Sequence, residues 1–154
     1  MIDDLYSARI LTLVANMPRA GRLAAPDASA EKTAKLCGSR IVVDVALDEA
    51  GRVADFAQDV AACALGQASA AVLGAAVVGA DLAEIELARD ALHAMLKSNG
   101  PPPLGRFSEL AVLEPVKDYP ARHASTLLAF EATAEAVRKA TAARETRTSR
   151  AGAA

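Results

Sequence analysis

Three side chains of this sequence could bind a metal or carry sulfur: Cys37, Cys63 and His123. Cys37 lies in LCGS, at a break between two strand-like runs, and Cys63 lies in ACALGQAS, at the start of an apolar helix-like run. A thiol at a helix N-terminus lies beside unpaired N–H groups and the positive end of the helix dipole, which favour the thiolate form. A thiolate can bind a metal or attack sulfur. His123 opens a later helix, and imidazole is a common metal ligand.

The same residues also fit other roles. Free cysteine is among the most buried residue types, so core packing is one alternative for both thiols. Cys63 and His123 could form the nucleophile and base of a hydrolase, although the sequence shows no third group to orient the histidine. The spacing contains no pair of C-x-x-C motifs typical of structural zinc sites. The residues alone therefore leave metal binding, packing and catalysis open.

Composition narrows the classes of protein. The chain has 154 residues, 53% of them hydrophobic and mostly alanine, with 3% aromatic residues, which favours one helix-rich domain. The net charge of −2 is spread along the chain and predicts no nucleic-acid partner. No apolar run reaches the roughly 18 residues of a membrane span, and the acidic start MIDDLYSARI does not resemble a secretory signal. We therefore expect a cytoplasmic protein with no membrane partner, in which the thiols stay reduced.

Hydrophobic periodicity predicts the elements that must position these residues. The first is an amphipathic helix that starts near Asp3 or Asp4 and ends at Pro18. A loop follows at 19–29. Residues 41–60 alternate between apolar and polar residues on both sides of Gly51, which predicts a β-hairpin, and a third strand is expected before Cys37.

The second half of the chain is predicted to be helical. Residues 64–79 are apolar nearly all round and predict a buried helix, and Asp81 with Glu84 resembles a capping box for a helix over 81–98. A short helical turn with a connector is expected over 105–119. The last long helix starts from Pro120, where the missing N–H of proline costs nothing.

These elements predict an α+β fold in which a three-stranded antiparallel sheet is packed on one face by several α-helices. The domain is expected to span 1–145. Residues 146–154 are basic and alanine-rich, with no large apolar side chain, and we predict that they form a disordered basic tail.

Four segments in this order, KLCGS, DEAGRVADF, ACALGQAS and DYPARHAS, resemble the NifU-like iron–sulfur cluster assembly scaffolds, over roughly Ile2 to Lys139. The resemblance implies a SufE/NifU-like fold. In the IscU and SufU branches of that family, Cys37 and Cys63 correspond to two of three ligand cysteines. Ser125 stands at the third cysteine, and Ser39 stands at an aspartate.

The resemblance also implies a ligand set. Because a neutral serine is a poor ligand for iron or zinc, we expect the metal ligands to be Cys37, Cys63 and His123, the last replacing the missing cysteine. Ser39, Ser125 and Arg122 are expected to be hydrogen-bonding neighbours of these ligands.

The function implied is that of a scaffold or carrier, not an enzyme, that binds iron and a transient iron–sulfur cluster of the 2Fe–2S type. Its partners would be a cysteine desulfurase and recipient apo-proteins, and a homodimer could supply the missing ligands. One alternative is a zinc-dependent, SufU-like sulfur acceptor for a cysteine desulfurase. The other is a degenerate, metal-free scaffold that acts as an interaction module.

Overall fold

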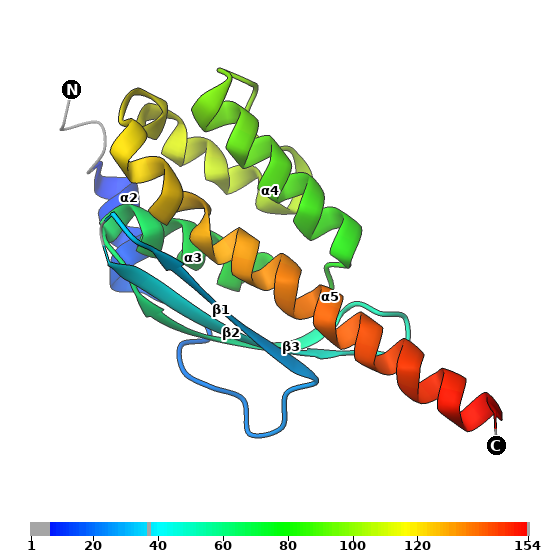
Figure 1. The fold of residues 1–154 in the computed structure, drawn as a ribbon. Helices are drawn as coiled ribbons and strands as arrows, with labels where there is room; N and C mark the ends of the chain where they lie inside the picture. The colour runs from blue at the N-terminus through cyan, green and yellow to red at the C-terminus, as the bar shows by residue number, and fades with distance from the viewer. Residues whose placement is uncertain (1–6, 37, 154) are drawn as a thin grey trace.

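The computed structural model describes residues 7–36 and 38–153, with side chains up to residue 146. The elements follow the order α2 (Ala8–Ala15), β1 (Ala28–Ala34), β2 (Ser39–Leu47), β3 (Val53–Ala61), α3 (Ala64–Ala76), α4 (Leu82–Lys97), η1 (Gly105–Asp118), η2 (Pro120–Arg122) and α5 (His123–Ala153). The helices lie on one side of the sheet, as Figure 1 shows. This arrangement confirms the predicted α+β fold.

The sheet is antiparallel throughout, in the order β1-β2-β3. Val43 pairs with Ala30 on one side and with Gln58 on the other. Both strands of the predicted hairpin are present, and β1 is the strand expected before Cys37. Helix α5 packs along β1 and β2, while α3 packs against β3 and α5. The loop between α2 and β1 passes under the opposite face of the sheet (Figure 1).

Capping residues mark the starts of α4 and α2. Asp81 caps α4, because its carboxylate accepts a hydrogen bond of 2.8 Å from the backbone N–H of Glu84. Helix α2 begins after Ser7, which has an extended backbone and accepts from the N–H of Ile10. The predicted start at Asp3 or Asp4 lies outside the described residues and stays a prediction.

The segment before α5 differs from the prediction. In place of a short turn and a connector, residues 105–118 form a 3₁₀ helix with a kink at Phe107. The side chains that it buries recur at every third position: Phe107, Leu110, Leu113 and Val116. A 3₁₀ helix has three residues per turn, so this spacing places all four on one face.

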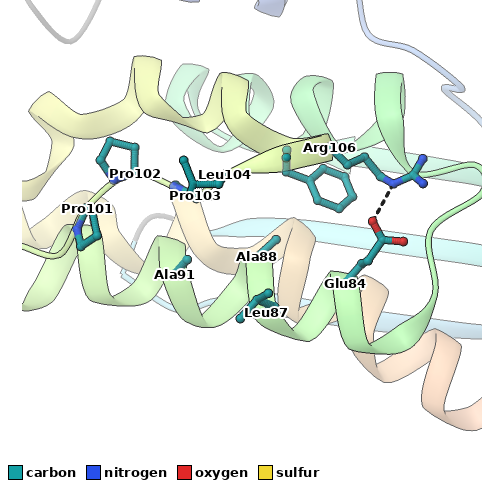
Figure 2. A pocket seen from close by; sticks show the side chains of 11 residues that line it. Glu84, Leu87, Ala88, Ala91, Pro101, Pro102, Pro103, Leu104 and Arg106 are labelled. Carbon is teal, nitrogen blue, oxygen red and sulfur yellow. Dashed lines mark hydrogen bonds and ion pairs between the residues drawn. The ribbon is translucent and has the colours of Figure 1, made fainter.

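A shallow apolar groove of about 340 Å³ lies between α4 and the segment that leads into η1. Figure 2 shows Leu87 and Ala91 on the α4 side and the three prolines 101–103 with Leu104 on the other. An ion pair of 3.0 Å between Glu84 and Arg106 lies at one end of the groove. None of the residues that line it belongs to the predicted ligand set.

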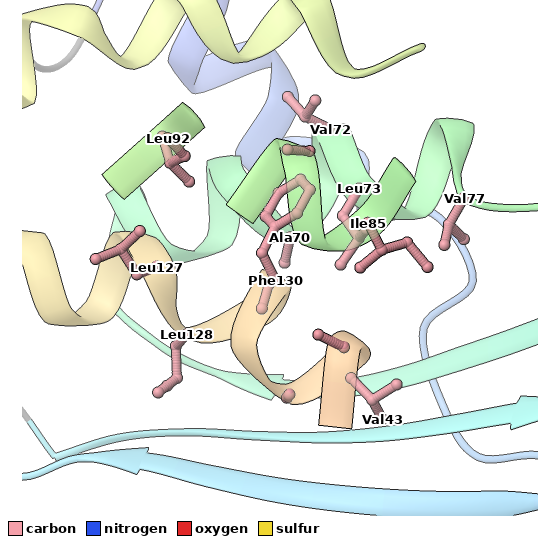
Figure 3. Packing of buried hydrophobic residues seen from close by; sticks show 14 of the residues in the cluster. Val43, Ala70, Val72, Leu73, Val77, Ile85, Leu92, Leu127, Leu128 and Phe130 are labelled. Atoms are coloured by element: carbon pink, nitrogen blue, oxygen red, sulfur yellow. The ribbon is translucent and has the colours of Figure 1, made fainter. Parts of the chain in front are cut away.

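The core lies between the sheet and the helices. Figure 3 shows Phe130 of α5 surrounded by aliphatic side chains from the sheet, α3 and α4. Phe130 also meets Phe107 edge to face, with the ring centroids 5.3 Å apart. Many of the other core positions are alanine, which lets α3 and α5 approach each other closely.

The last helix runs into the basic segment at the end of the chain, because α5 continues in backbone to Ala153. That residues 146–154 form a disordered basic tail stays a prediction. Within the described part of the chain, no helix combines the length and the apolar character needed to cross a membrane.

Candidate functional site

Two segments that are far apart in the sequence meet at one end of the sheet. Arg40 of β2 pairs with Ala61 of β3, so the turn between β1 and β2 lies at the same end of the sheet as the start of α3. Cys37 lies outside the described residues. Its neighbours Leu36 and Gly38 belong to this turn, and Gly38 adopts a positive φ of 70° that favours glycine.

Cys63 is the N-cap residue of α3 and carries a free, half-buried thiol. Its side chain makes no capping hydrogen bond, so the sulfur is not committed to the helix end. The side chain of Gln67 steadies the turn before it, because its Nε2 donates to the carbonyl of Ala62 at 2.7 Å. The junction between β3 and α3 therefore holds Cys63 in a defined position.

Ser125 of α5 is the residue that contacts this thiol. Its Oγ lies 3.3 Å from Cys63 Sγ, and Ser125 is buried. Gly66 makes this approach possible, because a Cβ atom at that position would lie only 3.0 Å from the carbonyl oxygen of Ser125. The structure thus brings the side chains of Cys63 and Ser125 together, and the role of Cys63 as a metal ligand stays a prediction.

His123 is buried, and both of its ring nitrogens have partners. Lys97 Nζ lies 3.3 Å from Nδ1, and Nε2 lies 3.0 Å and 3.2 Å from the carbonyl oxygens of Val116 and Lys117. An ammonium group only donates and a carbonyl only accepts, so these contacts match an imidazole that accepts at Nδ1 and donates at Nε2. A metal could reach this ring only after one of these contacts breaks. The ligand role of His123 stays a prediction.

Ser39 and Arg122 are the other two residues that were predicted to lie beside the ligands. Ser39 is buried at the start of β2, where its backbone pairs with Ala34. Arg122 contributes its carbonyl oxygen, which accepts hydrogen bonds from Ser125 Oγ at 3.1 Å and Thr126 Oγ1 at 2.7 Å. That the side chains of Ser39 and Arg122 act on the ligands stays a prediction.

The chemistry available in the described residues is that of one thiol beside one hydroxyl. Within 7–36 and 38–153, no group of three or more His, Cys, Asp or Glu side chains could hold a metal ion. The hydrolase alternative also lacks its pair, because Cys63 contacts Ser125 while the ring of His123 contacts Lys97 and the end of η1. The described residues therefore do not by themselves form a metal site, and the ligand role of Cys37 stays a prediction.

Comparison with known proteins places these features in a family. The family model for the NifU-like N terminal domain matches residues 5–126. A crystal structure of a nitrogen-fixing NifU-like protein (N-terminal) from Brucella abortus is 52% identical, with a TM-score of 0.88, and the match covers 91% of this chain and 96% of that one. No curated protein matches this chain.

Two more distant structures share the fold. A candidate iron–sulfur cluster assembly scaffold protein for the SUF system from Fervidobacterium islandicum is 19% identical, with a TM-score of 0.76. A hypothetical protein is 24% identical, with a TM-score of 0.78. Both matches cover 88% of this chain and 98% of the other chain.

Proposed function

This chain belongs to the NifU-like N terminal domain family, and we propose that it is an iron–sulfur cluster assembly scaffold or carrier. The observation that supports this most directly is the half-buried thiol of Cys63, free at the start of α3 and at the same end of the sheet as Leu36 and Gly38, the described neighbours of Cys37 in the sequence. Thiolates are the ligands that hold iron–sulfur clusters, and a site at the end of several elements leaves one side open for transfer.

The cargo is iron and a transient 2Fe–2S cluster, bound by the thiolates of Cys37 and Cys63. His123 is the third protein ligand in this proposal, and it binds after its Nδ1 exchanges Lys97 for the metal. Three protein ligands leave a 2Fe–2S cluster incomplete, so a small thiol or a second copy of the chain supplies the rest. An incomplete ligand set suits a carrier, because a recipient protein can replace the exchangeable ligand with one of its own.

The protein acts in the cytoplasm and not as an enzyme. A cysteine desulfurase supplies its sulfur, and apo-proteins receive the cluster.

Anaerobic reconstitution of the full chain with ferrous iron and sulfide tests this function. We expect a coloured protein with visible absorption bands and equal amounts of iron and acid-labile sulfide. Colourless protein that keeps stoichiometric zinc through the same procedure would favour the sulfur acceptor. Protein that retains neither metal would contradict both functions and leave the interaction module.

The ligand role of His123 has a separate prediction. We expect His123→Ala to weaken iron or zinc binding about tenfold or more, because a metal ligand is lost. His93→Ala is the matched control, since His93 is exposed on α4 and should leave binding unchanged. Metal titration with a competing chelator gives the affinities.

A second variant separates ligation from positioning. His123→Gln keeps an amide donor for the carbonyls of Val116 and Lys117 but removes the imidazole. If His123 is a ligand, this variant should bind as weakly as His123→Ala. Wild-type affinity in either variant would reject the ligand role and leave the scaffold function standing on the thiols.

A further inference from the structure

The outer edge of β3 is closed by a short stretch of the chain itself. Residues 19–21 form this edge strap, in which Ala20 makes a parallel β-bridge with Gln58. The N–H of Gln58 donates to the carbonyl of Arg19 at 3.0 Å, and the N–H of Gly21 donates to the carbonyl of Gln58 at 2.8 Å. The edge strap therefore pairs both backbone groups that Gln58 directs away from β2.

Two side chains of β3 hold the edge strap in place. Gln58 is buried, and its Nε2 donates to the carbonyl of Pro18 at 3.2 Å. Asp55 Oδ1 lies 3.4 Å from Arg19 Nη1, and the same oxygen accepts a hydrogen bond of 2.9 Å from the N–H of Phe56. Asp55 thus ties the edge strap to β3 and also pairs a second backbone N–H of the strand.

The edge strap lies where a further strand would pair. Successive residues in an antiparallel sheet direct their backbone groups alternately toward the two sides of the strand. Phe56 and Val60 each lie two residues from Gln58, so their backbone groups point toward the same outer edge. Val53 is already paired with residues 79–80, at 2.8 Å in both bonds. The part of the edge that another chain could use is therefore 55–61, and the edge strap lies at its centre.

We infer that the outer edge of β3 is a strand-pairing surface for a second copy of this chain, and that the edge strap keeps it closed. The side chains of β3 fit their own copy when Gln58 lies opposite Gln58 in an antiparallel pair. Phe56 then lies opposite Val60 of the second copy. Pairs of an aromatic and a β-branched side chain stabilise neighbouring strands.

The two aspartates of β3 select this register. With Gln58 at the centre, Asp55 lies opposite Ala61 and Asp59 lies opposite Ala57 of the second copy. Moving the centre by one residue toward the start of β3 would oppose Asp55 and Asp59. Moving it by one residue the other way would oppose Asp59 and Asp59. Like charges directly opposite each other destabilise paired strands, so the register centred on Gln58 is favoured over both neighbouring ones.

Pairing at this edge is separate from any sharing of ligands at the candidate site. Cys63 follows Gln58 by five residues, so the two copies of Cys63 would lie on opposite sides of the centre. At about 3.3 Å per residue, they would be roughly 33 Å apart. A dimer of this kind does not bring the two thiols to one cluster, so the inference does not depend on the proposed function.

The edge strap and a second copy compete for the same backbone groups of Gln58. Pairing needs an open strap in both copies, so the association constant of the dimer scales with the square of the open fraction. A change that raises the open fraction about tenfold should therefore raise the association constant about a hundredfold.

Gly21→Val tests the closing role of the edge strap. Gly21 has a φ of 120°, which a valine opposes, while a Cβ atom there would meet nothing within 4 Å in the described part of the chain. The substitution therefore opens the strap through its backbone and not through a clash. We expect sedimentation equilibrium to give an association constant about a hundredfold above that of wild type.

Gly51→Val is the matched control. Gly51 has a φ of 81°, and among the described residues nothing lies within 4 Å of a Cβ atom built there, but it belongs to the turn between β2 and β3. This variant carries a similar backbone strain away from the edge strap and should associate as wild type does. Equal association of the two variants would trace the effect to lost stability and overturn the inference.

A pair of charge variants tests the register in the Gly21→Val background. Ala61 is exposed, and in the proposed pair it lies opposite Asp55 of the second copy at two equivalent places. We expect Ala61→Lys to associate about tenfold or more strongly than Ala61→Asp, because one places opposite charges across the pair and the other like charges. Equal association of the two would overturn the register.

Hydrogen exchange of the Gln58 amide completes the test. In Gly21→Val this amide should exchange faster than in wild type at low protein concentration, and should slow again at concentrations where the dimer forms. A Gln58 amide that exchanges as slowly as in wild type at every concentration would overturn the closing role of the edge strap. Fast exchange in a variant that stays monomeric would overturn the pairing surface. If Gly21→Val does not fold, Gly21→Ala opposes the same φ with a smaller side chain and carries the same measurements.

Discussion

Cys63→Ser is expected to abolish retention of an iron–sulfur cluster and to lower the affinity for Co²⁺ by about a hundredfold or more. The variant replaces a thiolate by a neutral hydroxyl, which is a poor ligand for iron, cobalt or zinc. It also places a hydroxyl beside Ser125 Oγ, which in the wild-type structure is 3.3 Å from the sulfur. Anaerobic reconstitution and Co²⁺ titration of the variant measure both losses.

The same variant should fold at least as well as wild type. Serine is a preferred N-cap residue, whereas Cys63 occupies the N-cap of α3 without a capping hydrogen bond. We therefore expect the free energy of unfolding to be unchanged or to rise, by up to about 1 kcal/mol. Loss of metal in a protein of unchanged or raised stability is direct evidence for a ligand. A variant that keeps its cluster would remove Cys63 from the site.

The sheet and the buried helix could be predicted because their patterns match regular periods. Ile41, Val43, Val45 and Leu47 alternate with a period of two, and they form the face of β2 on which the helices pack. The run after Cys63 is apolar on all sides, and nine residues of α3 are buried. Asp55 and Asp59 of β3 are exposed.

The 3₁₀ helix η1 was missed because its period lies between those of a strand and an α-helix. Phe107, Leu110, Leu113 and Val116 are each three residues apart, and that spacing was present in the sequence. Long 3₁₀ helices are uncommon, so a spacing of three is easily assigned to a short turn. Burial of all four side chains against α3 and α4 stabilises a helix that would not persist alone.

Only part of the candidate site could be predicted from the sequence. The alignment of Ser125 with a ligand position led to the expectation that it lies near Cys63, and the two side chains are in contact. The direction of the His123 ring could not be derived in the same way. It depends on Lys97 at the end of α4 and on the last carbonyls of η1, which come from elements that are distant in sequence or were not predicted.

Asp44 was also missed, and the reason lies on the other face of the sheet. The alternation of β2 assigns Asp44 to the face away from the helices, where a carboxylate would ordinarily be solvated. The loop between α2 and β1 covers that face, and Asp44 is 0% exposed. Its carboxylate accepts hydrogen bonds from Arg22 Nε at 2.7 Å, Arg22 Nη2 at 3.0 Å, the backbone N–H of Leu23 at 3.0 Å and the hydroxyl of Ser29.

Asp44→Asn is expected to lower the free energy of unfolding at pH 7 by about 2–3 kcal/mol, the second large effect that the structure implies. An amide offers one oxygen where the carboxylate offered two, and on either side its NH₂ group faces an N–H of Arg22, which cannot accept. The loop that covers the sheet loses hydrogen bonds that hold it to β2. Urea denaturation followed by circular dichroism measures the change. Asp55→Asn is the matched control, because Asp55 is exposed and meets Arg19 only at 3.4 Å, so its replacement should have an effect within about 0.5 kcal/mol.

The lowered pKa of Asp44 determines how the stability of the protein should change with pH. Burial acts to raise the pKa of Asp44, but the hydrogen bonds from Arg22, Ser29 and Leu23, together with the charge of Arg22, outweigh it and lower the pKa below its ordinary value. A carboxyl with a lowered pKa in the folded state stabilises the protein above the pKa of the unfolded chain, about 3.9. This stability is lost as the pH falls through the lower folded value. Wild type should therefore lose more stability than Asp44→Asn between about pH 5 and pH 2, and the gap between the two proteins should close. A gap that stays constant over this range would mean that the charge of Asp44 does not anchor the loop.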